Sequence, residues 1–354
     1  MAELIRVPAF VDIHVHFRDP GFPEKENIES GIGAAIAGGY RAVCMMPNTL
    51  PAIDNADTLL SVDRRSRECS ESLSSEVSVL ATSAMTLGQL GKELVDFEAM
   101  DNADTLCHEL TGHGICGITE DGKTLYDYIL MEKVCEAAVR LGLPVMSHAE
   151  PEADITKRDI ELARKTGARF HFQHVSLAES VDLIREAKAE GLPVTCETAP
   201  HYFALTEAVI EEKGANAKMN PPLRTENDRL AIIEGIVDGT IDCIATDHAP
   251  HETAVKDVPF EEAANGIIGL ETALPVSYTM LVKGGIITLE RLIELMSTRP
   301  AEIIGLPPGN IFAELDLETP YTIDASSFRS KARNTPFDGM KVYGKVVGLV
   351  NSGS

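Results

Sequence analysis

The chain has 354 residues, of which 44% are hydrophobic and 24% are charged, as expected of a folded protein with a large core. Its 55 acidic and 31 basic residues give a formal net charge of −24, which argues against a nucleic-acid partner or an acidic membrane surface. No apolar run has the length of a membrane helix, and the first residues do not resemble a signal peptide.

Short β-branched runs alternate with longer helical stretches, a pattern typical of repeated βα units and a parallel sheet. The predicted helices include residues 27–38, 125–141, 177–190 and 226–237. Eight runs are predicted as strands, at residues 9–16, 41–46, 77–82, 114–119, 144–148, 169–174, 193–197 and 241–246. Eight such units predict an α/β fold, a single (β/α)8 TIM barrel. A doubly wound open sheet is the alternative, but no glycine-rich phosphate turn follows the first strand.

The first predicted strand carries two histidines near its end. Val11, Ile13 and Val15 are β-branched and favour a buried strand. Side chains on a strand repeat every two residues, so His14 and His16 are expected on one side, where both could reach one cation. By itself the pair could equally be two ordinary hydrogen-bonded histidines.

Other strands also end in polar residues that can bind a metal. In a barrel of this kind, the carboxyl ends of the strands meet on one rim, where active sites lie. Four histidines and two aspartates are expected there, namely His14, His16, Asp121, His148, His174 and Asp247. Imidazole and carboxylate ligands without a thiolate suit a hydrolytic Zn²⁺ site with room for water. Six ligands are enough for two ions, with Asp121 as a candidate bridge, whereas Glu120 should point the other way.

The segments beyond the eighth strand are expected to complete the barrel and to add a small appendage. A loop at 248–268 precedes helical segments near 270–281 and 289–295, and residues 309–350 are rich in β-formers. We therefore expect a barrel at residues 8–305 and a small β-rich appendage formed by residues 1–7 and 306–354.

The seven cysteines form no Cys-x-x-Cys pair, which favours a reduced, cytoplasmic protein. Four of them lie in predicted strands and are expected to be thiols in the core: Cys44, Cys116, Cys196 and Cys243.

Two stretches of the sequence carry a family resemblance. Residues 11–21, Val-Asp-Ile-His-Val-His-Phe-Arg-Asp-Pro-Gly, and residues 245–251, Ala-Thr-Asp-His-Ala-Pro-His, resemble the two signatures of the dihydroorotase family in the amidohydrolase superfamily. The resemblance covers nearly the whole chain and is greatest to the type-I branch. Further matching segments lie at residues 46–49, 196–201, 220–224, 269–272 and 333–336.

The resemblance implies a cyclic amidohydrolase with one or two Zn²⁺ per chain, which reversibly hydrolyses L-dihydroorotate to N-carbamoyl-L-aspartate in pyrimidine synthesis. It implies that the six residues named above are the metal ligands and that Asp247 is also the catalytic acid and base. Arg18 would bind the substrate carboxylate with a planar two-pronged donor, and Asn48 and His251 would be further donors. The implied substrate contacts are His16, Arg18, Asn48, Asn220, His251, Asn265 and Gly266.

The chain departs from the family pattern in three places, and one of them is the segment between His148 and His174, which is shorter than expected. Many relatives bridge two metals with a carboxylated lysine, but here Asp121 occupies that strand end, and Lys123 nearby is not assigned the role. Relatives also carry a longer β-rich segment before the two histidines. We therefore expect the N-terminal part of the usual small β-sandwich to be largely missing.

Two other functions stay open at this point. A hydantoinase or allantoinase would share the metal site and the type of reaction. A silent subunit that acts as a scaffold for aspartate transcarbamoylase is the alternative from another class, although silent copies usually lose metal ligands. We expect a small-molecule substrate, and we keep a homo-oligomer and an association with aspartate transcarbamoylase as hypotheses.

Overall fold

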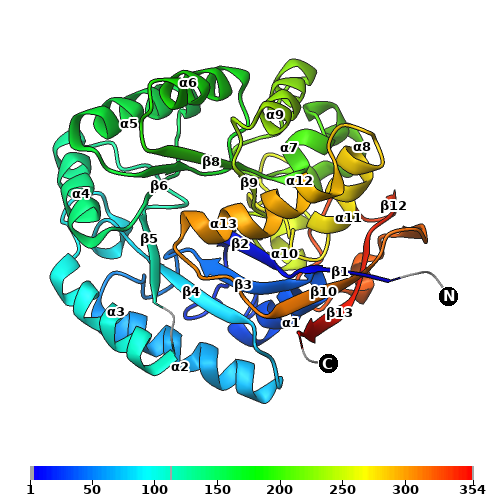
Figure 1. Ribbon diagram of the computed structural model, residues 1–354, viewed down its shortest axis with the longest axis horizontal. Coiled ribbons are helices and arrows are strands. Elements are labelled where there is room, and N and C mark those ends of the chain that lie inside the picture. Colours follow the sequence, from blue (N-terminus) through cyan, green and yellow to red (C-terminus); the bar gives the residue numbers. More distant parts are fainter. Residues whose placement is uncertain (1–3, 112–113, 353–354) are drawn as a thin grey trace.

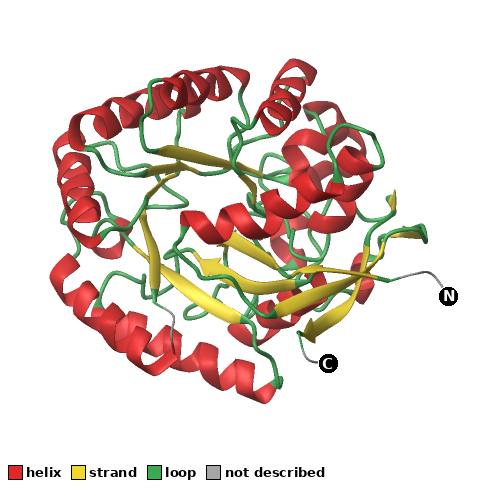
Figure 2. Ribbon diagram, viewed as in Figure 1, coloured by secondary structure: helices red, strands yellow, loops and turns green. Residues whose placement is uncertain are grey.

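Eight parallel strands form one sheet at the centre of the protein, and helices surround it (Figures 1 and 2). The computed structural model describes residues 4–111 and 114–352. The sheet follows chain order, and all eight predicted strands belong to it. Their bounds are β2 (Phe10–Val15), β3 (Tyr40–Met45), β4 (Ser78–Ser83), β5 (Ile115–Thr119), β6 (Val145–Ser147), β7 (Phe170–Phe172), β8 (Val194–Thr198) and β9 (Cys243–Ile244). The (β/α)8 barrel predicted from the sequence is confirmed.

The first and last strands of this sheet meet through a few local contacts. The backbone N–H of His16 donates to the carbonyl of His248 over 2.8 Å, and Val15 and His248 form an isolated parallel bridge. The backbone N–H of Thr246 donates to a side-chain oxygen of Asp12 over 3.2 Å. These contacts close the ring where β9 has already ended.

Long helices separate the strands and cover the outside of the barrel (Figure 2). Several begin at a side-chain cap, as at Asn27, Asp127 and Thr225, and several end at a glycine in the left-handed region. The long helices are α1 (Ile28–Gly38), α2 (Ala56–Ser72), α3 (Phe97–Thr111), α4 (Tyr128–Leu141), α5 (Glu152–Thr166), α6 (Ala178–Ala189) and α9 (Glu226–Asp238). Shorter helices are α7 (Pro200–Ala204), α8 (Ile210–Lys213), α10 (Thr253–Lys256), α11 (Ala273–Ser277), α12 (Leu289–Ile293) and α13 (Arg299–Ile303).

Apolar side chains fill the inside of the barrel at the end where the strands begin. Val11 and Ile13 of β2 pack there with Cys243, and Ala301 and Ile303 of α13 join the same cluster. This packing explains why α13 lies across the barrel in Figure 1.

The cysteines of the barrel differ from the prediction in one pair. Cys44 of β3 and Cys116 of β5 are joined by a disulfide, so the prediction of two separate thiols is wrong for this pair. Cys196 and Cys243 are free and buried, as predicted.

A second, three-stranded sheet joins the two ends of the described chain. Strand β1 (Ile5–Pro8) pairs with β10 (Ile311–Asp316), which pairs in turn with β13 (Lys345–Asn351), all antiparallel. Between β10 and β13 in the sequence, β11 (Tyr321–Thr322) and β12 (Lys341–Val342) form a two-stranded antiparallel ribbon. Because β1 leads directly into β2, its pairing with β10 holds the start of β2 against a strand more than three hundred residues later in the chain. The exact division into residues 8–305 and 306–354 stays a prediction.

Within the described residues, the helices are all too short or too polar to cross a membrane.

Candidate active site

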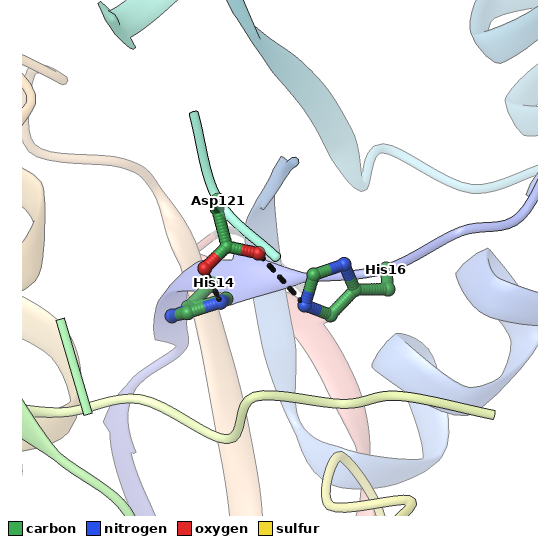
Figure 3. Close-up of side chains that lie close together, drawn as sticks. All are labelled: His14, His16 and Asp121. Carbon is green, nitrogen blue, oxygen red and sulfur yellow. Dashed lines mark ion pairs between the residues drawn. The ribbon is translucent and has the colours of Figure 1, made fainter. Parts of the chain in front are cut away.

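The six predicted metal ligands converge at the carboxyl ends of the strands. His14 lies on β2, and His16 follows that strand directly. Asp121 and His174 come two residues after β5 and β7, His148 comes directly after β6, and Asp247 comes three residues after β9. All six side chains are buried. In Figure 3, His14 and His16 both point toward Asp121.

Asp121 lies at the centre of this cluster. Its Oδ1 is 3.4 Å from His14 Nε2 and 3.2 Å from His148 Nδ1, and its Oδ2 is 3.3 Å from His16 Nε2. His174 Nε2 is 3.7 Å from Oδ1. Two sets of possible ligands share this carboxylate, one with His14 and His16 and one with His148 and His174. The geometry can therefore accept either one ion or two with Asp121 between them.

Asp247 faces His14 and His16 from the side of the barrel opposite to Asp121. Its Oδ1 is 3.0 Å from His16 Nε2 and 3.5 Å from His14 Nε2. Its backbone has a φ of 47°, and that of His174 has a φ of 37°. Non-glycine residues seldom adopt this region, and such strain is concentrated at functional sites because the surrounding structure enforces it.

The donor atoms of this cluster fit a metal ion. Three buried imidazole nitrogens have no hydrogen-bond partner, namely His14 Nε2, His148 Nε2 and His174 Nδ1. A buried nitrogen without a partner costs about 1–3 kcal/mol, so ligation would remove a penalty that the protein otherwise carries. Nitrogen and carboxylate oxygen donors without sulfur suit a hydrolytic zinc site.

The charges of the cluster support each other. Burial disfavours the charged ring of His14, but the carboxylates of Asp121 and Glu197 outweigh this effect and raise its pKa well above the usual value. Burial would likewise raise the pKa of Asp247, but His14 and His16 hold it below its usual value. His14 and His16 also hold the pKa of Asp121 well below its usual value, against the effect of burial, so both aspartates are carboxylates, the form that binds metal.

A cavity of about 240 Å³ opens above the cluster. Five of the six predicted ligands line it from one side, namely His16, Asp121, His148, His174 and Asp247. His14 is absent from the lining because it lies deeper, fully buried. All the other residues predicted to contact substrate also line the cavity, namely Arg18, Asn48, Asn220, His251, Asn265 and Gly266.

Arg18 places a positive charge in the lining of this cavity. No ion pair joins it to a carboxylate within the described part of the chain, and its Nε has no hydrogen-bond partner. Burial lowers its pKa to about 10, against the opposing influence of Asp247 and Asp121, so it stays charged at neutral pH. A half-buried guanidinium that lines a cavity and has no ion-pair partner is suited to bind an anion.

Comparison with known proteins agrees with this geometry. The model of the amidohydrolase family matches residues 5–313. A dihydroorotase of Desulforapulum autotrophicum is 42% identical over 97% of this chain and 85% of its own length. A dihydroorotase of Clostridioides difficile is also 42% identical, over 96% of this chain and 84% of its own length. The chain belongs to the dihydroorotase branch of the amidohydrolase family. It is therefore an enzyme of the cyclic amidohydrolase type with a metal cofactor.

Solved structures share the fold of this dihydroorotase-family chain. An L-hydantoinase (dihydropyrimidinase) from Arthrobacter aurescens superposes with a TM-score of 0.86 over 99% of this chain and 84% of its own, at 24% identity. A dihydropyrimidinase from Brevibacillus agri gives a TM-score of 0.82 over the same shares, at 20% identity. At these identities the likeness supports the barrel fold alone.

The contacts of Glu197 on β8 with the predicted metal ligands were not predicted from the sequence. His14 Nδ1–H donates to its Oε1 over 2.5 Å, and the backbone N–H of His174 donates to the same oxygen over 3.2 Å. His171 Nε2 lies 3.2 Å from Oε2. A carboxylate on Nδ1 fixes the ring so that Nε2 faces the cluster, as is usual behind metal-binding histidines. Glu197 lies in the segment 196–201 that carries the family resemblance, but the resemblance did not indicate this contact.

The two neighbours of Asp121 that were set aside lie outside the cluster. Glu120 accepts hydrogen bonds from the backbone N–H groups of Met85 and Thr86, so it points away from the predicted metal ligands, as expected. Lys123 donates to the backbone carbonyl of Gln89 over 2.7 Å.

Proposed function

We propose that the protein is a dihydroorotase, which reversibly hydrolyses the cyclic amide of L-dihydroorotate to N-carbamoyl-L-aspartate in pyrimidine synthesis. The single observation that carries this proposal is Arg18, a half-buried guanidinium without an ion-pair partner among the described residues, in the cavity above the predicted metal-ligand cluster. An uncharged hydantoin would leave that cation without a partner, which costs free energy, whereas the carboxylate of dihydroorotate matches it. The names of the relatives at 42% identity support the same choice over a hydantoinase or an allantoinase.

The residues around Arg18 offer complementary groups for the rest of the substrate. His16 Nδ1–H donates to Asn48 Oδ1 over 2.9 Å, which leaves the amide N–H groups of Asn48 for the substrate carboxylate. Asn220 donates to Glu150 over 3.1 Å at the mouth of the cavity and has a second N–H to offer. Asn265 and Gly266 line the wall that faces the predicted metal ligands, but their carbonyls and the Gly266 N–H already bond within the protein, so they shape the cavity.

The hydrogen bond of His251 changes the role expected for it. Its Nε2–H donates to the carbonyl of Asn265 over 2.7 Å, and Nδ1 is buried without a partner. Burial, aided by Arg18 and Lys25, lowers its pKa to about 3, so the ring is neutral. A neutral ring with its proton on Nε2 can only accept at Nδ1. We therefore propose that His251 accepts a ring N–H of the substrate and does not donate to the carboxylate.

We propose zinc as the metal, in one or two copies, held by His14, His16, Asp121, His148, His174 and Asp247. When bound, zinc supplies a nucleophilic water at neutral pH, because it lowers the pKa of that water toward about 7. Asp121 is placed to be shared by two ions, since both sets of ligands include it.

Asp247 is the residue that we propose to move the proton. Its carboxylate faces the cavity, is held by His16, and is ionised, so it can accept the proton of the attacking water. It can then return that proton to the leaving ring nitrogen. In the opposite direction the same carboxylate would take the proton from the ureido nitrogen of carbamoyl aspartate.

The test combines a metal count with an assay of three substrates on the purified protein. We expect one or two zinc ions per chain and turnover of dihydroorotate, with slow or no turnover of hydantoin and allantoin. Zinc with turnover of hydantoin but not of dihydroorotate would refute the proposal. Metal-free, inactive protein would favour the scaffold alternative, and co-purification with aspartate transcarbamoylase would then be the next measurement. A cytoplasmic location and a homo-oligomer stay part of this proposal, to be tested by fractionation and by light scattering.

A further inference from the structure

A buried lysine lies behind one wall of the cavity and is not itself part of the lining. Lys256 ends the short helix α10 and is 6% exposed. Its Nζ donates to three backbone carbonyls, those of Lys218 at 3.1 Å, Ala264 at 2.9 Å and Gly266 at 2.9 Å. An ammonium group has three N–H donors, so all three are used.

The charge of this lysine has no acidic counterpart. Although the chain has 55 acidic residues, no ion pair joins Lys256 to a carboxylate among the described residues. Burial, with a further contribution from the ammonium of Lys218, lowers its pKa to about 8. Burying an unpaired charge is unfavourable, and an apolar side chain would fill the space without that penalty. The three carbonyls are therefore the reason for a lysine at this place.

Each of the three carbonyls belongs to a segment that carries a residue of the cavity. Lys218 comes two positions before Asn220, and Ala264 and Gly266 stand on either side of Asn265. Helix α10 itself begins two residues after His251. One ammonium group thus ties together the segments of Asn220, His251 and Asn265, which all line the cavity.

Neighbouring contacts leave this wall little freedom to adjust. The backbone N–H of Gly266 donates to the carbonyl of Lys218 over 3.0 Å, next to the ammonium. Gly266 has a φ of 128°, and a Cβ added there would lie 2.8 Å from Ala249 Cβ. Asn334, from the C-terminal segment, donates to the carbonyls of both Ala249 and Gly266, at 3.1 and 3.0 Å.

We propose that Lys256 is a positioning residue that holds the wall formed by Asn220, His251, Asn265 and Gly266, and so sets the affinity for the substrate without touching it. The proposal rests on the proposed function only for the identity of the substrate. A lysine that merely stabilises the fold would lower the apparent kcat, through the amount of folded enzyme, and would leave KM unchanged.

The kinetic test compares Lys256→Met with Lys283→Met, which removes the same charge from the exposed pair with Glu318. For Lys256→Met we expect KM for dihydroorotate to rise about 10-fold with kcat within about 2-fold, the pattern of lost uniform binding. The zinc content should equal that of the parent. Lys283→Met should keep the parent KM. A parent-like KM in Lys256→Met, whether or not kcat falls, would overturn the proposal.

A second measurement needs no substrate. Hydrogen exchange of the Gly266 amide, which donates to Lys218, should be at least about 10-fold faster in Lys256→Met because the wall opens locally. Amides of β3 should exchange as in the parent. If the parent does not turn over dihydroorotate, the proposed function fails, but this exchange result still decides the role of Lys256. If Lys256→Met does not fold, Lys256→Gln replaces it, because it keeps two donors. Parent KM and parent exchange in that variant would count against the proposal.

Discussion

The side of the cavity that carries the predicted metal ligands, called the metal side below, is built on strand ends, whereas the wall that faces it is built on loops. His14 lies on a strand of the parallel ladder, and His148 and Asp121 follow two other strands by one and two residues, so the ladder fixes where they start. On the opposite side, His251 and Gly266 lie in irregular segments, which are held by the side chains of Lys256 and Asn334. A backbone ladder holds a site more tightly than individual side chains do. We therefore expect changes on the metal side to affect turnover and metal binding, and changes behind the wall to affect substrate binding.

The largest effect is expected at Asp247. Asp247→Ala should lower kcat by about 1,000-fold, because general acid–base catalysis by one group contributes about 10²–10⁴-fold. Most of the bound zinc should remain, since the other five ligands are intact. Asp247→Asn is the matched variant, because asparagine tolerates the positive φ but cannot take the proton. Metal analysis decides the outcome: loss of all zinc in both variants would mean that the ligand role of Asp247 outweighs its proton transfer.

A smaller effect is expected at Arg18, which lies between the two sides. Arg18→Met should raise KM for dihydroorotate by about 100-fold, because hydrogen bonds to charged groups contribute about 1.5–3 kcal/mol each. Steady-state kinetics measure this. Lys25→Met, which removes a cation near Arg18, is the control and should change KM by less than about 3-fold. An unchanged KM in Arg18→Met would contradict the assignment of the substrate carboxylate.

Glu197 tests whether the metal side depends on support from behind. Glu197→Gln weakens the acceptor for His14 Nδ1–H and should lower zinc affinity by about 10-fold or more, as is usual for partners of metal-binding histidines. Competition with a chelator measures the affinity directly. Glu120→Gln provides the control, because that buried glutamate binds backbone N–H groups at a neighbouring strand end. Equal zinc affinity in the two variants would remove Glu197 from the metal site.

The smallest effect is expected at Asn334. Asn334→Ala removes bonds to the carbonyls of Ala249 and Gly266 and to the N–H of His251, but leaves Lys256 in place. KM should rise by about 3–5-fold, in line with a net hydrogen-bond contribution of about 1 kcal/mol. Zinc affinity and kcat should stay at the parent values. A loss of zinc would show that the two sides of the cavity are not independent.

The fold and the metal-ligand cluster could be predicted because both depend on local sequence. The ends of parallel strands meet on one rim, so His14, His148 and Asp121 could be placed together from their positions after β-branched runs. The matching segments then pointed to Arg18 and Asn48. The contacts of Glu197 and Lys256 could not be predicted. Glu197 meets His14 only after folding, across 183 residues, and the carbonyls that Lys256 binds lie 8 to 38 residues away in irregular loops. The same holds for the disulfide between Cys44 and Cys116, which spans the strand between them.

The pairing of β1 with β10 has a consequence for the order of folding. Strands β2 to β9 can pair one after another as the chain leaves the ribosome, because each neighbour in the sheet is also the next strand in sequence. Ile5, in contrast, must wait for Leu315, its partner in the register. Contacts of such long sequence separation form slowly, since a long loop must close first. The base of the strand that carries His14 is thus secured only after nearly the whole polypeptide has been synthesised.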